Sequence, residues 1–167
     1  IIKVMDLKKE LERKKAQAFP VKTIEMPGMA VKDVDTKTGI ITGLFNSAYY
    51  YDSDKDITLP NVNAKSIKER GVGSAAVAKI KHLKDHTWGR HVGAFQVLDE
   101  REVEFNGTKV WGTYFETKAS NNTTGRDTLI EYQDGIIDNH SYGFKYEQGL
   151  YFEVGDEVWN KYAPLIR

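Results

Sequence analysis

Residues 91–118 read HVGAFQVLDEREVEFNGTKVWGTYFETK, and this stretch decides the fold class. Short apolar and aromatic runs stand on both sides of the Asn-Gly-Thr at 106–108, and Asn-Gly favours a tight hairpin turn. The pattern predicts two or three antiparallel strands. A second hairpin is predicted upstream, where DTKTG at 35–39 separates the apolar runs at 30–34 and 40–45.

The remainder of the chain predicts further strands and a few helices. Residues 123–135 have Thr as an N-cap candidate and close on Gly135, which is typical of a helix of two to three turns. Residues 63–80 are predicted to be helical, with interruptions at two glycines. Additional strands are predicted over 78–86 and, on either side of a loop at 147–149, within 136–159. Because helices and strands do not alternate regularly, the sequence predicts an α+β fold built on an antiparallel barrel or sandwich.

The N-terminal region differs in composition from the rest of the chain. Residues 5–18 consist of strong helix formers with few apolar positions, which predicts a short, mostly solvated helix. Two prolines and a glycine follow within 19–30, as expected of a linker or the entry to an edge strand. We therefore divide the chain into an N-terminal helix and linker at 1–28 and a β-rich domain at 29–167.

The composition narrows the class of function. Lys plus Arg and Asp plus Glu number 24 each, so the net charge is zero and a global nucleic-acid footprint is not expected. Neither a signal peptide nor an apolar run long enough to span a membrane is found in the sequence, so no membrane partner is expected. Cysteine is absent, which excludes a thiol nucleophile and fits a cytosolic protein. We find no phosphate loop, dinucleotide fingerprint or HExxH motif, and we expect no cofactor.

Three of the four histidines fall within KHLKDHTWGRH at 81–91. His82 and His86 are four residues apart, a spacing that places two metal ligands on one helix face. On a strand the same spacing separates them by roughly 13 Å, too far for one ion, so a metal site is the less favoured interpretation. The alternative is one histidine acting as a general base near neutral pH.

A serine in IIDNHSYGF at 136–144 is the best candidate nucleophile. Ser141 lies in an apolar, strand-like stretch and is followed by Gly143, whose bare backbone permits close approach of a substrate. Its neighbour His140 points to the opposite face of a strand, so a base for Ser141 must come from elsewhere. On residue type alone, an ordinary strand serine is the commoner interpretation.

Three blocks of the sequence resemble the prohead (capsid-maturation) serine proteases of tailed phages. They are VAKIKHLKDHTWGRHVGAFQVLDE at 77–100, the segment from Gly112 through HSYGF at 140–144, and the opening block at 39–71, in the family's order and spacing. The resemblance implies an assemblin-like antiparallel β-barrel flanked by a few helices and a serine endopeptidase with His86 as base and Ser141 as nucleophile. It also implies scaffold and major capsid proteins as substrates, inside the assembling prohead in the host cytoplasm.

Two departures from the family pattern stand out. Thr87 occupies a position where the family commonly has an acid, and no acid or histidine lies within 159–167, where the base-orienting residue is expected. We expect that residue in a last strand beyond Arg167, with Asp138 or Glu153 as substitutes. Oxyanion-hole candidates are backbone amides near Gly143, Arg90 and Arg167. The competing hypothesis is a non-catalytic β-barrel virion or scaffold-interaction module, and both hypotheses are compatible with a homo-oligomer.

Overall fold

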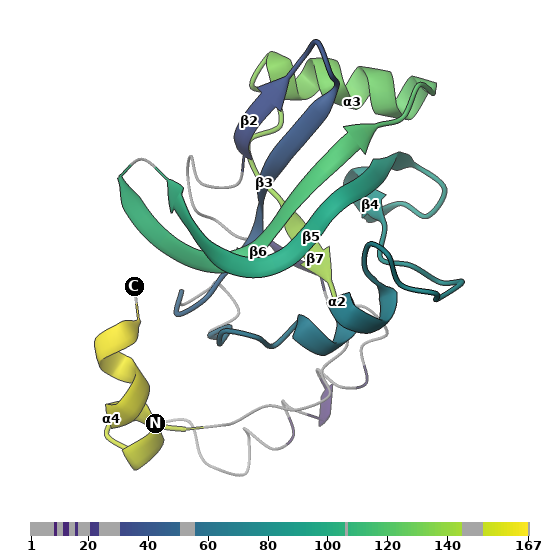
Figure 1. Ribbon diagram of the computed structural model, residues 1–167. Helices are drawn as coiled ribbons and strands as arrows, with labels where there is room; N and C mark the ends of the chain where they lie inside the picture. The colour runs from purple at the N-terminus through teal and green to yellow at the C-terminus, as the bar shows by residue number, and fades with distance from the viewer. Residues whose placement is uncertain are drawn as a thin grey trace.

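A computed structural model describes residues 9, 12, 13, 16, 21–23, 31–50, 56–105, 107–144 and 152–166. It confirms the predicted α+β class: one five-stranded antiparallel sheet, a separate strand pair and a few short helices (Figure 1). Of the helix predicted over 5–18, only Lys9, Glu12, Arg13 and Ala16 are described, and all four are helical and exposed. The loop predicted at 147–149 lies outside the described residues.

The hairpin of β5 (His91–Phe105) and β6 (Thr108–Ala119) forms the middle of the sheet. The strands pair from Phe105↔Thr108 to Gly93↔Ala119, and Gly107 in the turn has a φ of 76°, a conformation that glycine adopts without strain. This hairpin is the one that the Asn-Gly signal predicts. The second predicted hairpin is also confirmed, as β2 (Val31–Asp35) and β3 (Ile40–Ser47).

The strand order of the main sheet is β2-β3-β6-β5-β4, and within the described residues the sheet is open, with β2 and β4 (His82–Leu83) at its edges. Strands β1 (Val21–Thr23) and β7 (Ser141–Gly143) form a separate antiparallel pair. In Figure 1, β7 passes behind β5 and β6. The described strands thus show an α+β fold with an antiparallel sheet, but they do not show a closed barrel.

The helices differ in detail from those predicted. Helix α2 (Ala64–Arg70) ends at the first predicted interruption, where the Gly71 N–H donates to the carbonyl of Ile67. Helix α3 (Thr123–Gln133) is capped by Asn122 rather than by a threonine, because the Asn122 side chain accepts a hydrogen bond from the Gly125 N–H at 2.7 Å.

The strands predicted near the C-terminus are largely wrong. Of the described residues before the predicted loop, 136–144, only Ser141–Gly143 forms a strand. Further on, residues 157–159, predicted as strand, belong to α4 (Glu157–Tyr162), which is followed by the 3₁₀ turn η2 (Ala163–Leu165). An acid in the first turn of α4 and a lysine in its last turn suit the helix dipole.

The strand predicted over 78–86 is also much shorter than expected. Only two of its residues belong to β4, and the chain then tightens into the 3₁₀ turn η1 (Lys84–His86). His86 therefore ends a tight turn rather than a strand.

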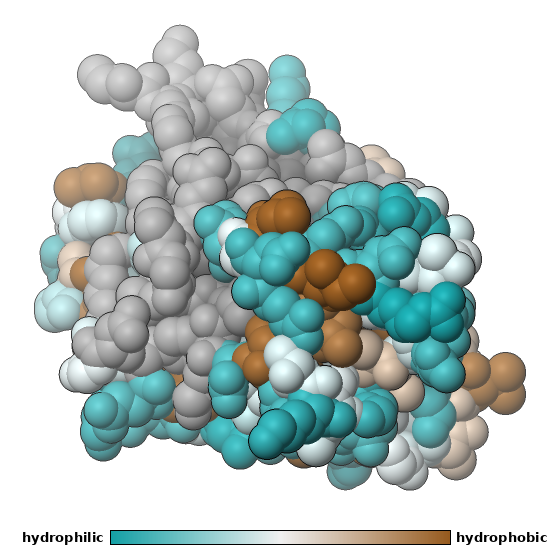
Figure 2. All heavy atoms as spheres, turned by 90° about the horizontal axis from the view of Figure 1, so that it is seen from above, coloured by the Kyte–Doolittle hydropathy of each residue, from teal (hydrophilic) through white to brown (hydrophobic). Residues whose placement is uncertain are grey.

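Two groups of buried side chains pack on the sheet. One centres on Phe115 and joins the sheet to Tyr132 of α3, while the other lies around Tyr114 and Leu44. Since Tyr114 and Phe115 are neighbours on β6, the two clusters occupy opposite faces of the sheet. Seen from above, the described residues present mainly hydrophilic side chains, with apolar areas between them (Figure 2). Within the described part of the chain, none of the helices has the length and apolar character needed to cross a membrane.

Candidate active site

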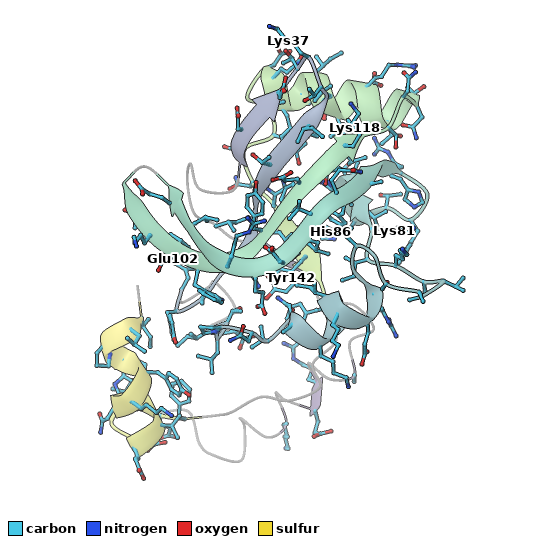
Figure 3. The ribbon with its side chains drawn as sticks, viewed as in Figure 1. Lys37, Lys81, His86, Glu102, Lys118 and Tyr142 are labelled. Atoms are coloured by element: carbon cyan, nitrogen blue, oxygen red, sulfur yellow. The ribbon has the colours of Figure 1, made fainter. Side chains whose placement is uncertain are left out.

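The structure brings His86 and Ser141 into contact. Nε2 of His86 hydrogen bonds to Oγ of Ser141, across a sequence separation of 55 residues. His86 is exposed and Ser141 is half-buried, so the pair lies at the surface, where a polypeptide could reach it. His86 and Tyr142, the neighbour of Ser141, are labelled in Figure 3. A hydroxyl facing an imidazole nitrogen is the arrangement that activates a serine nucleophile.

The turn between β4 and β5 presents His86. The backbone N–H of Lys84 donates to the carbonyl of Arg90 at 2.9 Å, and two further backbone bonds, Thr87 to Lys84 and Arg90 to Thr87, close the turn at 3.0 Å each. The Arg90 guanidinium also donates to the carboxylate of Asp85 at 2.8 Å. These bonds give the segment around His86 a defined shape although its side chains are exposed.

Two consecutive residues in this turn have left-handed backbone conformations. Asp85 and His86 have φ angles of 52° and 51°. A non-glycine residue in this region costs roughly 1–2 kcal/mol, and Asp and His accept it more readily than most residues. Such conformations cluster at functional sites, because the surrounding structure must be arranged to maintain them. The left-handed backbone of these two residues is therefore a second observation, independent of the hydrogen bond, that is typical of a functional site.

Inward-facing neighbours on both sides hold Ser141. The ring of His140 packs edge-on against Phe115 with a centroid distance of 4.8 Å, and the His140 side chain is buried. The ring of Tyr142 lies 5.8 Å from that of Phe45, and its hydroxyl is 3.3 Å from Oγ1 of Thr58. Because residues 140 and 142 face the core, Ser141 points the other way, toward His86.

Two further histidines, the half-buried His82 and the buried His140, pack against each other next to the candidate pair. The His82 ring packs against those of Phe95, Phe115 and His140, and its Nδ1 is 2.9 Å from Oγ1 of Thr117. Burial, with a smaller contribution from His140, lowers the pKa of His82 to about 3. His82 is thus neutral near pH 7.

The acids considered as substitutes for a base-orienting residue do not reach the candidate pair. Asp138 and Glu153 are exposed, and neither bonds to His86 among the described contacts. In the described ranges, His86 Nδ1 has no hydrogen-bond partner, and no group of three or more His, Asp or Glu side chains is arranged to hold a metal ion.

The candidates for an oxyanion hole differ in their surroundings. Gly143 is exposed, lies two residues after Ser141 on β7, and pairs with Val21 of β1. Arg90 is engaged by Asp85. The remaining candidate, at position 167, lies outside the described residues.

Two residues of α3 support the site and were not singled out from the sequence. Glu131 forms an ion pair with Lys84, two residues before His86. The next residue, Tyr132, shares a 2.7 Å hydrogen bond with Nε2 of His140, one residue before Ser141. Helical spacing places Tyr132 on the same face as the buried Gly125 and Thr128. The sequence can therefore indicate a core position for Tyr132, but not its hydrogen-bond partner.

Comparisons with known proteins give no relative for this chain. No family model, no curated protein and no solved structure matches it.

Proposed function

We propose that the protein is a serine endopeptidase in which Ser141 is the nucleophile and His86 the general base. The observation that carries the proposal is the hydrogen bond between His86 Nε2 and Ser141 Oγ at the surface. The left-handed backbone of Asp85 and His86 adds support, because strain of this kind persists where function requires a fixed side-chain direction.

The chemistry follows from the two side chains. As Ser141 Oγ attacks the carbonyl carbon of a peptide bond, its proton passes to Nε2 of His86. The tetrahedral intermediate collapses, the C–N bond breaks, and His86 returns the proton to the leaving amine. Water then attacks the acyl-serine ester with His86 again accepting a proton, which returns to Ser141 Oγ as the second product leaves.

The proposed substrates are the scaffold and major capsid proteins of a phage prohead, cleaved inside the immature shell. The support is the ordered resemblance of the three sequence blocks to the prohead proteases, together with the contact between the two residues that the resemblance selects. The proposal includes a barrel in which β7 bridges the sheet. Its support is that Tyr142 packs on Phe45 of β3 while Ser141 contacts the end of η1, next to β4.

The test uses the full chain and two serine variants. The protein is treated with a fluorophosphonate probe and, separately, incubated with the scaffold and capsid proteins encoded beside it, with new termini read by mass spectrometry. We expect one adduct, on Ser141, and defined cleavages that Ser141→Ala abolishes. Ser66→Ala, at an exposed serine of α2, is the matched control and should retain both activities.

Two results would overturn the proposal. One is a wild-type protein that neither reacts with the probe nor cleaves either candidate substrate. The other is cleavage that survives Ser141→Ala at the wild-type rate. Binding to scaffold or capsid protein without cleavage would instead favour the non-catalytic interaction module.

A further inference from the structure

The segment before His86 and the segment before Ser141 both bond to the C-terminal turn of α3. The Lys84 Nζ, two residues before His86, pairs with both carboxylate oxygens of Glu131. The Tyr132 hydroxyl hydrogen bonds at 2.7 Å to Nε2 of His140, one residue before Ser141. Adjacent helix residues point about 100° apart, so one turn can hold two separate segments.

Of the two contacts to α3, one is partly and the other largely shielded from water. The Lys84 side chain is 15% exposed and that of Glu131 is 29% exposed, so this ion pair is less screened than a fully exposed one. The rings of Tyr132 and His140 stack at 5.5 Å with an interplanar angle of 23°, and both side chains are buried. Removing either partner would leave a polar group buried without its partner, which is costly.

The two segments also touch each other in the core. The ring of His82, four residues before His86, lies 6.1 Å from the ring of His140. A displacement of one segment therefore disturbs the other through this contact as well as through α3. The chain leaving α3 is fixed too, since the backbone N–H groups of Ile136 and Ile137 donate to the carbonyl of Glu131 at 2.8 and 3.2 Å.

We propose that Glu131 and Tyr132 are positioning residues: the C-terminal turn of α3 sets the separation of His86 and Ser141 by holding Lys84 on one segment and His140 on the other. Neither residue contacts the reacting atoms. The catalytic consequence rests on the proposed function, whereas the geometric one does not. A shift of about 1 Å between reacting groups can cost on the order of a hundredfold in rate, so small changes at α3 matter.

The test compares Tyr132→Phe and Glu131→Gln with two matched controls. Tyr114→Phe removes the hydroxyl of another buried tyrosine, which donates to Glu116 at 2.8 Å on the opposite face of the sheet. Glu102→Gln removes the acid of an exposed pair with Lys109. The first readout is the ¹⁵N chemical shifts of the His86 ring, with Ser141→Ala giving the shifts expected when the hydrogen bond is absent. The second is kcat and KM for cleavage.

We expect Tyr132→Phe and Glu131→Gln each to move the His86 ring resonances toward those of Ser141→Ala, while both controls keep the wild-type values. We expect kcat to fall about tenfold or more in the two positioning variants with KM within about twofold. Wild-type His86 resonances in both variants, or equal changes in the controls, would overturn the inference. If wild-type Ser141 reacts with no probe, the proposed function fails, and the resonances alone still decide the geometric inference. Because the Glu131 side chain is partly exposed, Glu131→Gln tests the idea even where Tyr132→Phe does not fold.

Discussion

His86 and Ser141 hydrogen bond to each other from the extremities of two very short elements. His86 is the last residue of η1, and Ser141 is the first residue of β7. Neither element is long enough to be stable alone, so the contact depends on what surrounds it. The β4–β5 turn and the buried neighbours of Ser141 supply that support.

Replacing the proposed base should inactivate the protein as completely as replacing the nucleophile. We expect His86→Gln to lower the rates of fluorophosphonate labelling and of cleavage by at least about 10³-fold, because the pair acts as a unit. His91→Gln, at an exposed histidine in the same stretch, should keep wild-type rates. Labelling of His86→Gln at more than a tenth of the wild-type rate would contradict the assignment.

The left-handed backbone at Asp85 can be tested with a pair of substitutions. Asp85→Gly and Asp85→Ala both remove the carboxylate that pairs with Arg90, but only glycine adopts a φ of 52° without strain. We expect Asp85→Gly to be more stable than Asp85→Ala by about 1 kcal/mol in urea unfolding. Equal stability of the two variants would show that the turn is not left-handed at this residue in solution.

The shielded ring of His82 should make the fold sensitive to acid. Its pKa is about 3 in the folded protein against 6.5 for an unperturbed histidine, so below about pH 6.5 the unfolded chain takes up a proton that the folded chain does not. Lowering the pH should therefore lower the free energy of unfolding. The contribution of this group between about pH 7 and pH 5 is about 2 kcal/mol.

A pair of histidine variants isolates this effect. His82→Asn keeps a polar atom near Thr117 but does not titrate, so its unfolding free energy should change less between the two pH values. His91→Asn, which alters an exposed histidine, should follow the wild type. An unaltered pH dependence in His82→Asn would assign the acid sensitivity to other groups.

Close packing at the start of α3 predicts a large effect of one methyl group. A Cβ at Gly125 would lie 2.2 Å from the carbonyl oxygen of Ser120 and 2.8 Å from that of Val92, both backbone atoms that cannot move cheaply. We expect Gly125→Ala to lower the free energy of unfolding by about 2 kcal/mol or more. Asp127→Ala, at an exposed position of the same helix, should change it by less than about 0.5 kcal/mol.

The features predicted well from the sequence are those set by neighbouring residues. The Asn-Gly turn fixed the β5–β6 hairpin, and DTKTG fixed the β2–β3 hairpin. Two features that the local pattern did not indicate were missed. The turn at Asp85 is closed by backbone bonds among Lys84, Thr87 and Arg90, and residues 157–159, predicted as strand, form the first part of α4.

The candidate site also has residues that the local sequence indicated and residues that it did not. The strand-like context and Gly143 made Ser141 the best candidate nucleophile, although an ordinary strand serine was the commoner interpretation, and the resemblance paired it with His86. No local pattern indicated Glu131 or Tyr132 as supports, because Lys84 and His140 reach them from other parts of the chain. The third member of a catalytic triad was expected beyond Arg167 or at an acid, and the described contacts of Asp138 and Glu153 do not connect either residue with His86.

The hairpin of β5 and β6 has a consequence for the order of folding. Its two strands are joined by a tight turn, so it closes with little loss of chain entropy and forms early. The hydroxyl–imidazole contact must instead close a 55-residue separation that encloses this hairpin and α3. The His86–Ser141 contact therefore forms only after the hairpin and α3 have docked, and under the proposed function cleavage waits for that step.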